Sequence, residues 1–134
     1  KRAVSAVRSF RAETGLDGEL RGRVPEGVEA GVYAALSGVE PADSPGGGAR
    51  ATLTAGDVVV ELFLTEEMRR LEVERLRKEI SRVEGEVERA RRKLANAGFV
   101  ERAPSEVVGR EREKLETNSR LLETLERRLS EYLP

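Results

Sequence analysis

The stretch VERLRKEISRVEGEVERARRKL, Val73 to Leu94, carries apolar residues at alternating spacings of three and four. Such a spacing is typical of a helix with a narrow apolar seam, as in a coiled coil. A second seam with the same spacing runs from Val108 to Tyr132, with polar residues at Glu111 and Asn118. The sequence therefore predicts two long helices in succession.

The two seams match each other in reverse order. If the chain folds back between the helices, Leu94 lies opposite Val108 and every later layer follows without a slip. A short connection favours pairing within one chain, because closing a small loop costs less than recruiting a partner. We therefore expect a monomer with an antiparallel two-helix coiled coil over residues 65–134, about 45 Å long from the helical rise. We expect Glu111 to turn its carboxylate outward from the seam.

The connection between these helices, KLANAGFVERAPSEVV, is rich in turn signals. We expect a tip at about residues 95–105, where the chain turns on Gly98 and Pro104 and leaves Phe99 and Val100 with little chance of burial. An aromatic ring in this position can stack on an unpaired base. Capping the end of the seam is the alternative role for the same ring.

Charges are sorted along the predicted coiled coil. Residues 89–114 carry eight basic and four acidic side chains, whereas the rest of residues 65–134 carries nine basic and twelve acidic ones. Arginine side chains suit phosphate and stacked bases, so this cationic end is a candidate for binding RNA. A solvated charged face is the structural alternative. The candidate RNA-binding residues are Arg89, Arg91, Arg92, Lys93, Phe99, Arg102 and Arg110.

The first 64 residues hold most of the glycines and nearly all the strand signals. The pattern predicts a helix over residues 1–14, a strand over 19–24 and a strand at Val39. It also predicts a hairpin of strands 51–54 and 58–64 around Ala55-Gly56-Asp57. Four apolar residues predict a second short helix, namely Val28, Val32, Ala35 and Leu36. The expected fold class is α+β, with a small junction domain over 1–64 and a coiled-coil arm over 65–134.

Composition excludes several kinds of chemistry. The chain has no cysteine and no histidine, so disulfides, Cys/His zinc sites and histidine catalysis are absent. The segment EPADSPGGGAR, Glu40 to Arg50, lacks the Gly-Lys-Ser/Thr of a phosphate loop, and we assign it no role. A hydrolase that uses two glutamates has no supporting motif. We expect no catalytic residue, no metal and no cofactor in this chain.

The segment KLANAGFVERAPSEVVGREREKLE closely resembles the C-terminal arm of bacterial valyl-tRNA synthetases. Upstream, AVRSFRAETGL resembles the helix that leaves the anticodon-binding bundle in that family, with Ser9 in place of the usual asparagine. The strand VVVELFL also has a counterpart there, whereas residues 17–57 look divergent. The arm residues that fit the family pattern are Lys93, Leu94, Asn96, Phe99, Arg102, Ala103, Pro104, Glu106, Val107, Val108, Glu111, Lys114 and Leu115.

The resemblance implies that the tip leans on the elbow of a bound tRNA, where the D and T loops meet. It also implies that ATP binding, catalysis and valine selection belong to parts of a parent enzyme outside this chain. Arg8 and Arg11 are further candidates for facing tRNA, although the resemblance assigns them no role. The main alternative is a structural or protein-interaction coiled coil that binds no RNA.

Two further expectations concern the chain as a whole. It begins without methionine inside a helical pattern, so we expect a piece of a longer polypeptide rather than a natural split protein. It has no long apolar run and no signal peptide, so we expect a soluble, cytoplasmic protein with no membrane partner.

Overall fold

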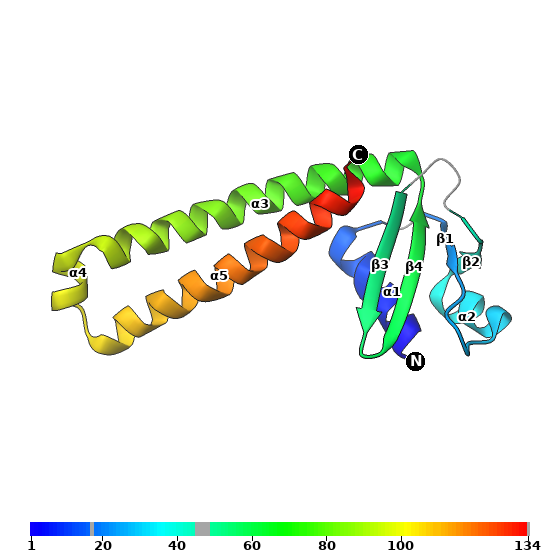
Figure 1. The fold of residues 1–134 in the computed structure, drawn as a ribbon, viewed down its shortest axis with the longest axis horizontal. Coiled ribbons are helices and arrows are strands. Elements are labelled where there is room, and N and C mark those ends of the chain that lie inside the picture. Colours follow the sequence, from blue (N-terminus) through cyan, green and yellow to red (C-terminus); the bar gives the residue numbers. More distant parts are fainter. Residues whose placement is uncertain (17, 45–48, 134) are drawn as a thin grey trace. The chain divides into compact units, whose positions relative to one another are not determined.

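The computed structural model describes residues 1–16, 18–44 and 49–133 and has an α+β architecture (Figure 1). The chain divides into two compact units, Lys1–Val73 with Glu131–Pro134, and Glu74–Ser130. Its elements are α1 (Arg2–Thr14), β1 (Leu20–Arg23), α2 (Ala30–Ser37), β2 (Val39–Pro41), β3 (Ala49–Ala55), β4 (Val58–Leu64), α3 (Glu66–Ala95), α4 (Ala97–Arg102) and α5 (Ser105–Tyr132).

The first unit contains a four-stranded sheet in the order β2-β1-β4-β3. β1 pairs parallel with β2 and antiparallel with β4. The predicted hairpin is confirmed as β3 and β4, and Gly56 makes its turn with a φ of 64°. Only glycine fits at position 22, because a Cβ there would lie 2.5 Å from the carbonyl oxygen of Glu61. Part of the segment Glu40 to Arg50, residues 45–48, lies outside the described residues.

The core of this unit follows the alternation of the strands, except at the end of β4, where Phe63 on the opposite face is buried as well. Val60, Leu62 and Leu64 of β4 are buried together with Leu20 of β1 and Ala51 of β3. α1, which matches the helix predicted over residues 1–14, packs near β3 and β4. Its buried residues are Ala3, Val7 and Phe10.

α2 forms where a helix is predicted but turns a different face inward. Glu29 caps it by accepting a hydrogen bond from the backbone N–H of Val32 at 2.7 Å. Tyr33 and Ser37 are its buried residues. The four apolar residues that predict the helix, Val28, Val32, Ala35 and Leu36, are exposed.

α3 begins as predicted, with the hydroxyl of Thr65 accepting from the N–H of Met68 at 3.1 Å. In the second unit α3 and α5 run in opposite directions with α4 between them (Figure 1). The buried side chains of this unit all belong to the two predicted seams. They are Leu76, Val83, Val87, Ala90, Val108, Glu111 and Leu125.

The connection between α3 and α5 is a six-residue helix rather than the predicted turn on Gly98. Asn96 stops α3 and caps α4, because its side-chain oxygen accepts from the N–H of Phe99 at 3.3 Å. Gly98 lies inside α4, and its φ is not positive. Pro104 does mark a boundary, since its carbonyl oxygen accepts from the first turn of α5. Phe99 and Val100 are half-buried, so the expectation of little burial is wrong.

Candidate nucleic-acid interface

A groove rich in basic side chains lies between α3 and α5, at the end next to α4. Its lining contains four cations and two carboxylates, and we name it the basic groove. It is lined by Glu86, Arg89, Ala90, Arg92, Lys93, Glu111, Lys114 and Asn118. Three of the predicted RNA-binding residues, Arg89, Arg92 and Lys93, therefore meet on one surface.

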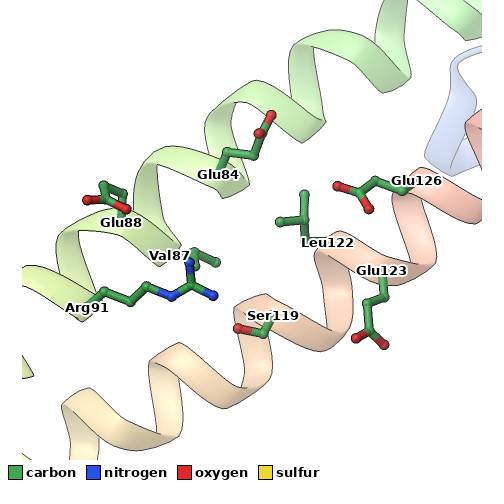
Figure 2. Close-up of a pocket in the computed structure, with 8 residues that line it drawn as sticks. All are labelled: Glu84, Val87, Glu88, Arg91, Ser119, Leu122, Glu123 and Glu126. Carbon is green, nitrogen blue, oxygen red and sulfur yellow. The ribbon is translucent and has the colours of Figure 1, made fainter.

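A second groove between the same helices has the opposite charge, and we name it the acidic groove. It contains four glutamates and a single cation, Arg91, whose side chain reaches from α3 towards α5 (Figure 2). The lining consists of Glu84, Val87, Glu88, Arg91, Ser119, Leu122, Glu123 and Glu126. Arg91 is thus separated from its sequence neighbours Arg89, Arg92 and Lys93, which line the basic groove.

Helical geometry explains this separation. Residues two apart on a helix point about 200° away from each other, so Arg89 and Arg91 emerge on different sides. Glu86 and Lys93 are seven residues apart and share one flank of the buried seam; Glu84 and Arg91 share the other. A run of basic residues that is continuous in the sequence is therefore divided between two surfaces of unlike charge.

Glu111 is the most buried charged residue of the basic groove, with a side chain only 9% exposed. The ammonium groups of Lys93 and Lys114 lie 3.9 Å and 3.8 Å from its Oε2. The expectation that this carboxylate turns outward is wrong. A buried carboxylate is costly unless cations compensate it, and here two lysines from opposite helices do so.

The two arginines of the basic groove are paired within their own helix. Arg89 donates to Glu86 at 2.6 Å, and Arg92 donates to Glu88 at 3.2 Å. The hydrogen bond from Arg89 and its charge lower the pKa of Glu86, and Arg82 and Lys114 contribute less. Both arginines are more than half exposed, so these pairs are weak. A phosphate can replace either glutamate as the partner.

The remaining candidates lie outside both grooves. Arg102 is in the last turn of α4 and Arg110 is exposed on α5. The guanidinium group of neither residue makes a hydrogen bond or an ion pair with any residue that the structure describes. Phe99 is half-buried in α4, and its ring is only partly available for stacking. Arg11, by contrast, is structural, because it donates to the carbonyl oxygens of Gly18 and Gly38 at 3.1 Å and 3.2 Å.

Among the four cations of the basic groove, Lys114 is absent from the predicted RNA-binding set. It lies on α5, distant in sequence from the basic run of α3. The signal that identifies it is the seam register, since positions that flank facing seams on the same side meet across an antiparallel helix pair. Lys93 and Lys114 occupy such positions.

Among residues 1–16, 18–44 and 49–133, acidic side chains form no cluster able to hold a metal ion. No helix in those ranges combines the length and apolar character needed to cross a bilayer.

The helices that carry the basic groove match a known family. Residues 70–132 fit the family model described as the valyl tRNA synthetase tRNA binding arm. The chain belongs to the valyl-tRNA synthetase family. The resemblance seen in the arm motif is therefore confirmed, and the matched residues include α4, both grooves and most of α3 and α5.

Relatives within the valyl-tRNA synthetase family support the assignment. A valine–tRNA ligase of Bradyrhizobium diazoefficiens is 35% identical over 142 residues, which cover 92% of this chain. The valine–tRNA ligase of Carboxydothermus hydrogenoformans is 52% identical over 58 residues, which cover 43% of this chain. That of Geobacter sulfurreducens is 48% identical over 66 residues, which cover 48% of this chain. The matched regions span only 15%, 7% and 7% of these three relatives. The chain thus corresponds to a small part of each ligase.

Proposed function

We propose that this chain is the tRNA-binding C-terminal portion of a valine-type aminoacyl-tRNA synthetase and that its basic end contacts the tRNA elbow. The observation that carries the proposal is the basic groove, which gathers Arg89, Arg92, Lys93 and Lys114 at one end of the family arm. Holding the elbow positions the tRNA while other parts of the enzyme act. ATP binding and catalysis belong to those other parts of the enzyme. We expect the protein in the cytoplasm.

In this proposal α3 and α5 pack as an antiparallel coiled coil within a monomer. Support comes from the buried side chains of Glu74–Ser130, all of which occupy the predicted seams. The ion pair between Lys93 of α3 and Glu111 of α5 also joins the two helices of one chain. A rigid pair of helices suits the function, because it holds the groove in a fixed shape before RNA arrives.

The geometry favours phosphate as the main ligand of the groove. All four of its cations are more than half exposed at the end of long side chains. Phosphate contacts of this kind give binding that weakens as salt rises. The acidic groove on the other flank repels phosphate, so RNA approaches the basic flank.

Phe99, Arg102 and Arg110 extend the proposed contact beyond the groove. Arg102 and Arg110 have no competing partner in the described chain, so their charge is available for phosphate. The partly exposed ring of Phe99 offers a stacking surface for one base. Arg91 is the weakest member of the predicted set, because four glutamates line the groove into which it reaches.

Fluorescence anisotropy with labelled tRNA at two salt concentrations tests the proposal. A variant with Arg89→Glu and Lys93→Glu should lose most of its affinity, and its salt dependence should decrease by roughly 0.7 to 0.9 per lost phosphate contact. The matched control is Arg77→Glu with Lys78→Glu on the same helix, outside the groove. Equal loss in both variants, or no binding by the unmodified chain, contradicts the proposal and favours a coiled coil with a protein partner.

A further inference from the structure

α2 presents an apolar face to solvent. Val32 and Leu36 are 55% and 54% exposed, and Val28, just before the helix, is 37% exposed. Ala35 is exposed as well. Spacings of three and four from Val32 place Ala35 and Leu36 on its side of α2, and Val28 lies just before the N-cap residue Glu29. We name these four exposed residues the α2 stripe.

The rest of α2 makes this exposure unusual. The helix sequence, AGVYAALS, contains no charged residue. Its inner side is already occupied, because Tyr33 is fully buried and Ser37 is 5% exposed. A helix that is apolar on both sides is normally covered on both sides. A single exposed valine such as Val59 on β4 needs no explanation, whereas a stripe of four residues marks an interaction surface.

We propose that the α2 stripe docks onto another domain of the same synthetase polypeptide, outside these 134 residues. This inference rests on the proposed function, which makes the chain one portion of a longer ligase. The chain matches 15% of the length of its Bradyrhizobium diazoefficiens relative, so most of such a polypeptide lies elsewhere. A tethered domain meets the stripe at a high effective concentration, and a small apolar stripe then suffices for docking.

Charge indicates what the covering surface is like. Glu26 and Glu29 are exposed beside the stripe at the start of α2. The matching surface is therefore apolar at its centre and basic at its edge. A second copy of this chain is a poorer occupant, since its own α2 has the same glutamates beside it and carries no basic residue.

Hydrogen–deuterium exchange compares α2 in the 134-residue chain with α2 in the full-length polypeptide that carries it. We expect the amides of residues 30–37 to exchange at least tenfold more slowly in the full-length polypeptide. Replacement by Val32→Glu and Leu36→Glu in that polypeptide should restore fast exchange. Val59→Glu, on an equally exposed valine of β4, should leave α2 protected.

Equal exchange of α2 in both proteins overturns the inference. So does protection in the 134-residue chain that grows with its concentration, because that result identifies a second copy as the occupant. The milder pair Val32→Ala and Leu36→Ala, with thermal melting, shows whether the glutamates merely unfold the helix. Binding of tRNA to the 134-residue chain is measured in parallel. Failure there with intact α2 protection contradicts the proposed tRNA contact but not the docking.

Discussion

The ammonium of Lys93 on α3 lies 3.9 Å from the carboxylate of Glu111 on α5, and Lys114 reaches the same oxygen at 3.8 Å. Two cations therefore share one carboxylate, and the groove keeps a surplus of positive charge. The arrangement links stability to binding. Glu111 joins the helices through Lys93, and its negative charge offsets part of the positive charge of the groove.

Glu111→Gln is expected to tighten tRNA binding. The amide keeps the shape of the side chain but removes the charge that offsets Lys93 and Lys114. One charge at about 4 Å in a solvated site is worth about 1 kcal/mol, which corresponds to about fivefold in the dissociation constant. Anisotropy at low salt measures the change. The control is Glu116→Gln, which frees Arg120 outside the groove; equal tightening in both variants means that the groove has no special role.

Phe99→Ala is expected to weaken tRNA binding if the ring stacks on a base. Loss of one stacked base costs about 1 to 3 kcal/mol. Phe99→Leu separates stacking from packing, because leucine fills the half-buried site without offering an aromatic face. Affinity should fall in both variants while thermal stability falls mainly in the alanine variant. Unchanged affinity in the leucine variant shows that Phe99 only covers the end of the seam.

Leu76→Ala is expected to destabilise the second unit. Leu76 is fully buried in α3, and removing such a side chain costs about 2 to 5 kcal/mol. The matched control is Leu121→Ala on α5, at a leucine that is 37% exposed, for which the expected change is within about 0.5 kcal/mol. Urea unfolding followed by circular dichroism measures both. Similar small losses in the two variants contradict the packing of the seam.

Tyr33 is expected to make the stability of the first unit fall at alkaline pH. Burial raises the pKa of its phenol above the ordinary 10.0, although the Ser37 side chain opposes the shift. The folded state therefore holds this proton more tightly than the unfolded state. The contribution of Tyr33 to the free energy of unfolding is complete below about pH 10 and is lost as pH rises through the folded pKa. Urea unfolding at increasing pH should show this loss in the unmodified chain. Tyr33→Phe should remove it, and an identical pH profile in that variant means that another group titrates.

The helices and the hairpin follow from local signals. Thr65 has both the position and the hydroxyl needed to cap α3, and Gly56 supplies the positive φ that the turn requires. Seam spacing also identifies every buried side chain of Glu74–Ser130. These features depend on residues close in sequence, or on a period that persists over many turns, and are therefore predictable from the sequence.

Features that depend on contacts distant in sequence are harder to predict. The apolar spacing of Val28, Val32 and Leu36 predicts a helix, but spacing alone does not say which side faces the sheet. Tyr33 takes the inner side because the core accepts its ring. The charge run at Arg89 to Lys93 predicts a basic surface, yet only the facing helix shows that Arg91 lies among glutamates and that Lys114 completes the groove.

Footprinting of tRNA by the 134-residue chain decides whether the basic groove holds the elbow. We expect protection of the D and T loops at the elbow, and loss of that protection in a variant with Lys93→Glu and Lys114→Glu. Protection confined to the anticodon or acceptor ends, or elbow protection that survives this double substitution, contradicts it.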